Sequence, residues 1–312
     1  MKNSATNFVK IIREICAEEN IILKSYSADW IFRLEKDGVH DIILGYQFGL
    51  NSASVNMLCC DKCAASEIMS ECGIPNIEHE LFASPENQKF MGFPGNWKRL
   101  LEMLDQYGTV VCKPNQGTGG ENVCRCSTMY ELEEAVHLIF LKSDYMAVSK
   151  FYEIEDEYRA IILDGEIRLI YRKRRPQITG DGVHSIAGLC MLYADHSALP
   201  SEVAVADLSR IPAKGEKVIL NWKHNLGLGA HADFLIEDSL RCEISGIVRR
   251  VYEEIGVRFA SIDIVSTNEG LKVLEINSGV MMENFAGESP QNYRTAREIY
   301  RDAILKMMKE GE

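Results

Sequence analysis

The sequence lacks any run of about 18 apolar residues, so we expect no membrane-spanning segment. Its first twenty residues are charged throughout and lack the apolar core of a secretory signal. Cations are scarce, with 34 Lys and Arg against 46 Asp and Glu, which gives a formal net charge of −12. Such a chain lacks the basic footprint that nucleic acids select. These absences exclude secreted, membrane-spanning and general DNA-binding proteins, but not nucleotide binding, which needs only a few local cations.

The composition of the 312 residues is that of an ordinary globular protein, with 46% hydrophobic and 26% charged residues. This length allows two or three subdomains. Ten cysteines without a secretory signal indicate a reducing, cytoplasmic location. Cys60 and Cys63 form one C-x-x-C pair, but no second pair at zinc-like spacing follows, so we favour reduced thiols over a zinc site.

The pattern along the chain predicts an α+β protein in three parts. Residues 1–58 form a short N-terminal cap with one helix and three strands, and residues 59–152 form a small subdomain with a glycine-rich loop. Residues 153–312 form a larger subdomain that ends in a charged helix, 290–310. Within it, the alternation of apolar and polar residues predicts long antiparallel strands at 158–165, 166–174 and 217–224.

The sharpest chemical signal is a predicted hairpin of strands 260–265 and 271–278 around a three-residue loop, 268–270. In that register Asp263 lies opposite Glu275, and period-two alternation puts Asn277 on the same face. The core-facing residues are Ile262, Ile264, Leu274 and Ile276. Two carboxylates and an amide are oxygen ligands suited to Mg²⁺. The alternative is an acidic hairpin that faces solvent.

A second signal is Lys113-Pro114 at a strand end, followed by the glycine-rich loop 116–120. A lysine beside such a loop can hold the β- and γ-phosphates of a nucleotide through its charge and through backbone N–H groups. The loop leads into a strand and lacks a following Gly-Lys-Ser/Thr, so it is neither a Walker A loop nor a dinucleotide fingerprint. The alternative is a hairpin tip that binds no ligand.

Several motifs occur in an order that resembles the ATP-grasp carboxylate–amine ligases, over residues 52–285. They are Asp61-Lys62, Gly73-Ile74-Pro75, Lys113-Pro114 with its loop, Glu157-Tyr158-Arg159, Ser261-Ile262-Asp263 and Glu275-Ile276-Asn277. Residues 180–186, 211–216 and 225–229 are similar to the ATP-grasp part of cyanophycin synthetases and bifunctional glutathione synthetases. The resemblance implies an ATP-grasp fold, in which two α+β subdomains hold ATP between them.

The resemblance also implies a reaction and its partners. ATP and Mg²⁺, with Mn²⁺ as an alternative, would serve to join a carboxylate to an amine through an acyl phosphate. The substrates would be small, an amino acid or a peptide, with no nucleic acid or membrane partner, and a homodimer is left open. Two alternatives stand beside this interpretation: an enzyme that modifies a peptide or carrier-protein end, and a non-catalytic ATP-binding protein.

Site residues follow from the resemblance position by position. The residues matching those that reach and cover the phosphates are Lys62, Lys113, Gly117, Gly119 and Gly120. The residues matching the adenine slot and the ribose carboxylate are Ser149, Lys150, Phe151, Tyr152 and Glu157. The residues matching the Mg²⁺ ligands are Asp263, Glu275 and Asn277. The residues matching the basic groups that face the transferred phosphate and the substrate carboxylate are Arg159, Arg172 and Lys173.

The sequence departs from the family pattern in three places. Ser149 stands where related proteins often have a glutamate at the adenine. The chain after Asn277 lacks the usual proline, which indicates a different substrate choice. The N-terminal cap is short, so the extra domains of the named relatives are missing. For Arg174 and Arg175, a solvated run of charges is an equal alternative to a role in the site.

Overall fold

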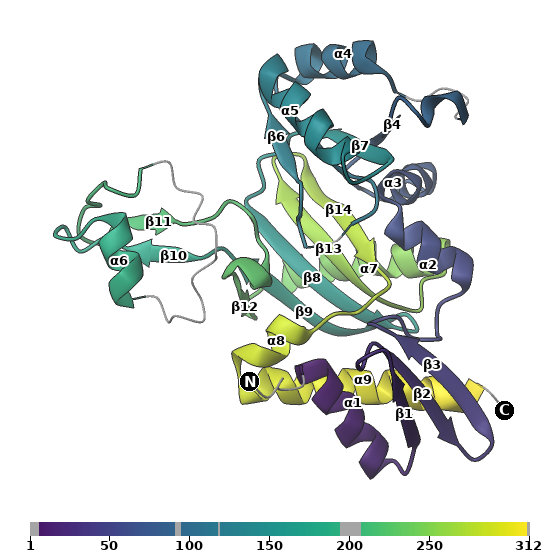
Figure 1. Ribbon diagram of the computed structural model, residues 1–312. Coiled ribbons are helices and arrows are strands. Elements are labelled where there is room, and N and C mark those ends of the chain that lie inside the picture. Colours follow the sequence, from purple (N-terminus) through teal and green to yellow (C-terminus); the bar gives the residue numbers. More distant parts are fainter. Residues whose placement is uncertain (1–5, 91–94, 118, 194–206, 311–312) are drawn as a thin grey trace.

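The chain is organised around a five-stranded antiparallel sheet, seen in a computed structural model that describes residues 6–90, 95–117, 119–193 and 207–310 (Figure 1). The order of the strands in this large sheet is β12-β9-β8-β13-β14. They are β8 (Asp156–Leu163), β9 (Glu166–Arg174), β12 (His231–Asp233), β13 (Phe259–Thr267) and β14 (Gly270–Asn277). The predicted strands at 158–165 and 166–174 therefore correspond to β8 and β9.

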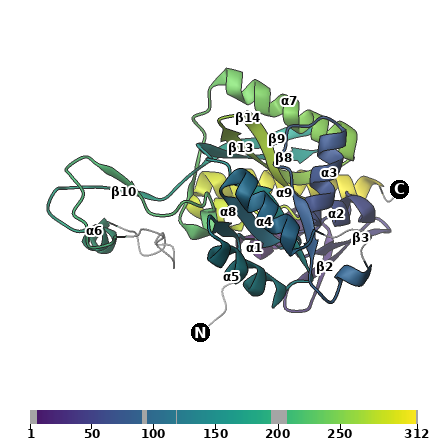
Figure 2. The same cartoon turned by 90° about the horizontal axis from the view of Figure 1, so that it is seen from above.

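Strict alternation gives the large sheet one apolar face and one mixed face. The apolar face, with Ile162, Ile262 and Ile264, packs against helix α7 (Asp238–Ile255), which lies across the sheet in Figure 2. Residues one step along the same strands, among them Arg159 and Asp263, therefore project from the opposite face. That face carries the charged groups described below.

A second sheet has the order β4-β7-β5-β6. Its strands are β4 (Glu80–Ala83), β5 (Val110–Pro114), β6 (Cys124–Cys126) and β7 (Tyr145–Lys150). Helices α4 (Trp97–Tyr107) and α5 (Met129–Phe140) cover one face through a core that includes Leu100, Leu132 and Ile139. The segment before β4 joins this small sheet to the large one, because the backbone N–H of Val273 donates to the carbonyl of Pro75 at 2.8 Å.

The N-terminal cap consists of helix α1 (Asn7–Glu18) and a sheet of β1 (Ile22–Tyr26), β2 (Ile31–Lys36) and β3 (Val39–Leu44). It shares one apolar core with helix α9 (Pro290–Glu310) and with the end of the large sheet. Helix α8 (Glu283–Glu288) fixes the start of α1, since the Glu283 carboxylate accepts hydrogen bonds from the backbone N–H groups of Asn7 and Phe8 at 2.7 and 2.9 Å. The cap is therefore anchored by the C-terminal segment, and the boundaries at residues 58 and 152 stay predictions.

Between β9 and β12 the chain forms a lobe that projects from the large sheet (Figures 1 and 2). The lobe contains β10 (Gln177–Thr179), α6 (Ile186–Tyr193), β11 (Lys217–Ile219) and the 3-10 turn η2 (Leu226–Leu228). The predicted long strand at 217–224 is wrong: only three of its residues are extended, and they pair with β10. The strand that pairs with β9 beyond the lobe is the short β12, whose three residues carry too little pattern for sequence to reveal it.

The remaining elements are α2 (Ala53–Cys60), α3 (Lys62–Glu71) and the 3-10 turn η1 (Gln88–Phe90). Asp61 caps α3 by accepting a hydrogen bond from the N–H of Ala64 at 2.9 Å, which fixes Lys62 as its first residue. No helix in the described ranges is long and apolar enough to cross a membrane.

Candidate active site

The acidic hairpin of β13 and β14 brings Asp263 opposite Glu275, as predicted. Its turn differs from the prediction, because Thr267 pairs with Gly270 and only Asn268 and Glu269 lie between the strands. A bulge between Asp263 and Ile264 then shifts the register by one residue and restores the predicted pairing at the carboxylates. The same bulge makes one core prediction wrong: Leu274 is half-buried, and Val273 takes its place in the core.

Asp263 is the centre of a buried charge cluster on the mixed face of the large sheet. Arg159 from β8 donates two hydrogen bonds to it, Nε to Oδ1 and Nη2 to Oδ2, both at 2.7 Å. Lys173 from β9 places Nζ 2.9 Å from the same Oδ2. Burial opposes ionisation of Asp263, but the Arg159 and Lys173 charges prevail and hold its pKa below the usual range. Asp263 is therefore ionised and tightly held.

Glu157 closes the other end of this cluster. Its Oε1 accepts a hydrogen bond from Lys173 Nζ at 2.5 Å, and both side chains are buried. Burial raises the pKa of Glu157, although the Lys173 charge acts in the opposite direction. His224 Nδ1 lies 3.8 Å from Glu157 Oε2, and burial lowers the pKa of His224 to about 4, so this imidazole is neutral near pH 7. The cluster thus pairs two cations, Arg159 and Lys173, with two carboxylates.

The oxygen groups at this hairpin fit a hard cation in chemical type. Glu275 Oε1 accepts a hydrogen bond from the neighbouring Asn277 Nδ2 at 3.1 Å, and the Glu275 carboxylate forms no ion pair with a described residue. Asp263 Oδ1 accepts one hydrogen bond and retains a lone pair, whereas Oδ2 accepts from both cations. No three His, Cys, Asp or Glu side chains of the described residues converge on one position. Of the three predicted ligands, Glu275 and Asn277 are therefore less engaged by protein cations than Asp263 is, and more readily accept a metal ion.

Lys113 lies close enough to Glu275 of this hairpin for their charges to interact, and Lys62 lies near Lys113. Lys113 on β5 is 7% exposed, and burial lowers its pKa to about 8, against the opposing charge of Glu275. Lys62 starts helix α3, which is tied to the end of β5 by Asn115: the Asn115 carbonyl accepts from the Lys62 backbone N–H at 3.3 Å, and its side chain accepts from Cys63 N–H at 3.1 Å. Buried Asn115 therefore sets the two lysines beside each other, and Glu275 lies near Lys113.

The glycine-rich loop lies against Lys62, whose Nζ donates to the carbonyl oxygen of Gly117 at 2.9 Å. Gly119 and Gly120 have φ values of +75° and +76°, a left-handed backbone that other residues adopt only with strain. Thr118, the middle residue of the predicted loop, lies outside the described residues. The loop therefore belongs to the same corner of the molecule as the two lysines.

Among the residues predicted for the adenine slot, Ser149 lies on the face of the small sheet that carries Lys113, whereas Lys150, Phe151 and Tyr152 contact other charged side chains. Ser149 is buried on β7 and, by the register of the small sheet, shares a face with Lys113. Lys150 forms an ion pair with Glu269 at 2.5 Å, and its Nζ lies 4.5 Å from the centre of the Tyr152 ring. The Phe151 ring is covered by the guanidinium of Arg125, 4.1 Å from the ring centre.

Arg172 is not brought together with Arg159 and Lys173. It lies on the opposite face of the large sheet, where its guanidinium donates to Asp156 at 3.2 Å and to Asp233 at 2.8 Å. The alternation of β9 forces this separation, because neighbouring residues of a strand point to opposite faces. We therefore leave Arg172 out of the site.

Sequence reasoning missed His79, which precedes β4 and is buried with neither ring nitrogen hydrogen-bonded in the described structure. Burial, with the nearby charges of Lys113 and Lys62, holds its pKa well below the usual range, so the imidazole is neutral. An unsatisfied buried polar group destabilises a fold, which singles this position out. No motif marks His79 in the sequence, because its isolation comes from tertiary packing.

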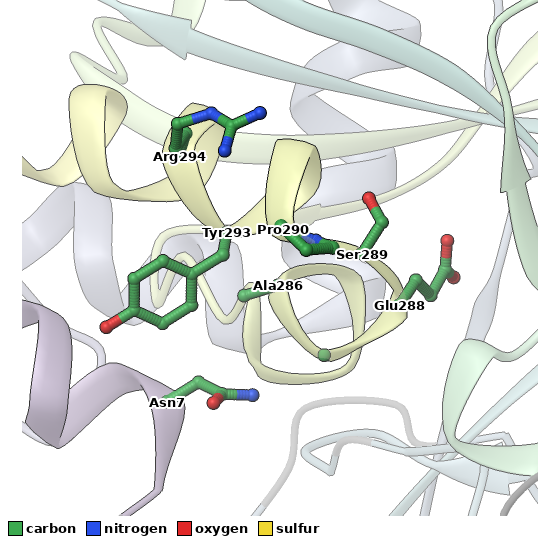
Figure 3. Close-up of a pocket in the computed structure, with 8 residues that line it drawn as sticks. Asn7, Ala286, Glu288, Ser289, Pro290, Tyr293 and Arg294 are labelled. Carbon is green, nitrogen blue, oxygen red and sulfur yellow. The ribbon is translucent and has the colours of Figure 1, made fainter.

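An open pocket of about 480 Å³ lies elsewhere, where α1 meets the junction of α8 and α9 (Figure 3). Its lining residues are Asn7, Ala286, Gly287, Glu288, Ser289, Pro290, Tyr293 and Arg294. None of the predicted site residues lines it. The pocket is thus distinct from the corner where the lysines face the acidic hairpin.

Two neighbouring sheets, one with Lys113 on β5 beside the glycine loop and the other with Glu275 on β14 close to Lys113, form the arrangement expected of an ATP-grasp fold. Solved structures agree. A bifunctional glutathione synthetase from Pasteurella multocida superposes with a TM-score of 0.56 at 15% identity, over 94% of this chain and 44% of that one. A D-alanine–D-alanine ligase from Bacillus anthracis gives a TM-score of 0.52 at 15% identity, over 81% and 67% of the two chains. The predicted α+β ATP-grasp fold is confirmed.

Among curated proteins, this chain is similar to cyanophycin synthetases. That of Trichormus variabilis is 22% identical in an alignment of length 245, and the match covers 72% of this chain and 26% of the relative. That of a Synechocystis species is 25% identical in an alignment of length 252, and the match covers 72% of this chain and 27% of the relative. The chain thus spans about a quarter of the length of these relatives, and no family model matches it. These matches confirm the predicted resemblance to ATP-grasp ligases.

Proposed function

We propose that this protein is an ATP-dependent ligase that joins a carboxylate to an amine and releases ADP and phosphate. The observation that carries the proposal is the juxtaposition of unpaired ammonium groups with a carboxylate that has no ion pair. Among the described residues Lys62 and Lys113 form no ion pair with a carboxylate, and Glu275, whose charge acts on Lys113, forms none either. A polyphosphate with a divalent cation satisfies both halves of such a site.

In this proposal Lys62 and Lys113 hold the outer phosphates, and the glycine loop covers them. Asp263, Glu275 and Asn277 would hold Mg²⁺, which when bound offsets negative charge on the transferred phosphate. Arg159 keeps Asp263 in place through Nε and Nη2, and its Nη1 has no hydrogen-bond partner among the described residues. We assign Nη1 to the transferred phosphate and Lys173 to the positioning of Asp263 and Glu157.

The reaction then takes two steps. A carboxylate oxygen of the acid substrate attacks the γ-phosphorus, and the bond to the β,γ-bridging oxygen breaks, which leaves ADP and an acyl phosphate. The amine then attacks the acyl carbon, the C–O bond to phosphate breaks, and the departing phosphate takes up the proton that the amine loses. Closure of the loop excludes water, which would otherwise hydrolyse the acyl phosphate.

We propose an amino acid or a short peptide as the substrate class, since the similar structures named above are a glutathione synthetase and a D-alanine–D-alanine ligase. We also propose a reducing, cytoplasmic environment, in which the ten cysteines of the sequence would stay reduced. The two alternatives make different demands. A peptide or carrier-protein end would have to reach the lysine corner, whereas a non-catalytic ATP-binding protein would show no turnover.

A screen of amino acids and short peptides for ADP release, with products weighed by mass spectrometry, tests the proposal. We expect ADP formation that depends on both an acid and an amine, and a product whose mass equals the sum of the two less one water. ATP binding without amine-dependent ADP release across the screen would favour the non-catalytic alternative.

A further inference from the structure

The glycine loop is held from two sides. On one side Lys62 donates to the Gly117 carbonyl, as described above. On the other, two side chains reach it from the segment that follows β11: Lys223 Nζ donates to the carbonyl of Gly120 at 3.0 Å, and Asn225 Nδ2 to that of Gly119 at 2.9 Å. Lys223 and Gly120 are 103 residues apart in the sequence, so tertiary structure alone creates this contact.

The charge of Lys223 is otherwise uncompensated. Within the described ranges, Lys223 forms no ion pair with a carboxylate, a property it shares with Lys62 and Lys113. The cations deeper in the cluster differ, because Arg159 and Lys173 are each paired with a carboxylate. Among the described residues, two ammonium groups without a carboxylate partner, those of Lys62 and Lys223, therefore contact one loop of a protein whose net charge is −12, and Lys113 lies beside Lys62.

We propose that Lys223 is a third phosphate-binding lysine, which rests on the Gly120 carbonyl when no nucleotide is present and moves to the outer phosphates of a bound nucleoside triphosphate. The inference rests on the proposed function and extends it to a residue outside the motifs. A neutral carbonyl is a weaker partner for an ammonium group than a phosphate oxygen, so the exchange is favourable. The flexible side chain of lysine allows the move without a backbone change.

The geometry at Gly120 fits this exchange. A Cβ built on Gly120 would lie 3.8 Å from Lys223 Cδ and 4.0 Å from its Nζ, so the lysine stem already rests on the loop backbone. Rotation of the Lys223 side chain alone would therefore bring its ammonium group from the Gly120 carbonyl to the outer phosphates.

The test compares Lys223→Met with Lys217→Met, which removes the same charge from an exposed position on β11 of the same lobe. Calorimetry with Mg²⁺ measures the affinity of each variant for ATP and for AMP, which lacks the outer phosphates. We expect Lys223→Met to weaken ATP binding by about 10-fold or more, the usual effect of losing a hydrogen bond to a charged group, and to leave AMP binding unchanged. Lys223→Arg should restore most of the loss, and Lys217→Met should behave as the wild type.

Wild-type ATP affinity in Lys223→Met, or an equal loss for ATP and AMP, would overturn the inference while leaving the proposed ligase intact. A wild-type chain that binds no ATP would overturn both.

A second measurement needs no change at Lys223. Its Nζ lies 5.8 Å from the Trp222 ring, so in a chain with Trp30 and Trp97 replaced by Phe, the fluorescence of Trp222 should change with ATP and not with AMP. An identical response to both nucleotides would contradict the move.

Discussion

Replacement of Lys113 by Met should stabilise the protein while it impairs nucleotide binding. The buried ammonium of Lys113 has no carboxylate partner among the described residues, and its pKa is lowered from 10.5 to about 8. At 1.36 kcal/mol per pKa unit, this shift corresponds to a cost of about 3 kcal/mol for burying the charge. Methionine has a similar length and no charge, so the free energy of unfolding should rise by about that amount at pH 7.

The pH dependence of this gain follows from the direction of the shift. Below pH 8 the lysine is charged in both the folded and the unfolded state, and the folded protein bears the full cost. Between pH 8 and 10.5 only the unfolded state retains the proton, so the stability of the wild type rises with pH and the advantage of Lys113→Met shrinks. Above that range the advantage disappears.

Urea unfolding of both proteins between pH 6.5 and 10, with Lys217→Met as the exposed control, measures these differences. ATP at about 100 times its dissociation constant should stabilise the wild type by about 2.7 kcal/mol and the Lys113→Met variant by far less. A variant that is less stable than the wild type at pH 7 would refute the reasoning. A gain of equal size at pH 7 and pH 10 would refute it as well.

The other predictions separate the roles of the hairpin and the loop. Glu275→Gln should abolish ADP release with little change in stability. Asp263→Asn should also abolish ADP release, and it should lower the free energy of unfolding by about 3 kcal/mol because Arg159 and Lys173 lose a buried partner. Equal stabilities of the two variants would contradict this difference. Gly119→Val should lower kcat by about 10-fold or more. It should lower the free energy of unfolding by only about 1–2 kcal/mol, since the new side chain meets no atom within 4 Å although the valine backbone must adopt a φ of +75°. An unchanged kcat would show that the loop does not cover the phosphates.

The hairpin shows how far sequence reasoning reaches. The pairing of Asp263 with Glu275 was predictable because alternation and a short turn nearly determine a two-stranded register. The bulge that puts Val273 instead of Leu274 in the core was not predictable from the hairpin alone. Val273 exchanges backbone hydrogen bonds with Pro75 and Ile77, a segment distant in sequence, and these contacts hold it in that position. Local pattern thus predicts the partners, and tertiary contact determines the exact path.

The lobe and the charge cluster show where such reasoning stops. The apolar and basic residues at 217–224 have the composition of a strand, yet this segment lies beside the glycine loop and presents Lys223 to it. Arg172 and Lys173 are adjacent in sequence, but the alternation of β9 places them on opposite faces, as the period of a strand requires. Buried, unpartnered His79 carries no signal in the sequence.

The most direct test of the central claim is to supply hydroxylamine in place of the amine, with ATP, Mg²⁺ and the acid substrate found by the screen. An acyl phosphate reacts with hydroxylamine, so the account predicts a hydroxamate of the acid, formed in equal amount with ADP. Formation of AMP and pyrophosphate with the hydroxamate would show an acyl adenylate and would contradict the account.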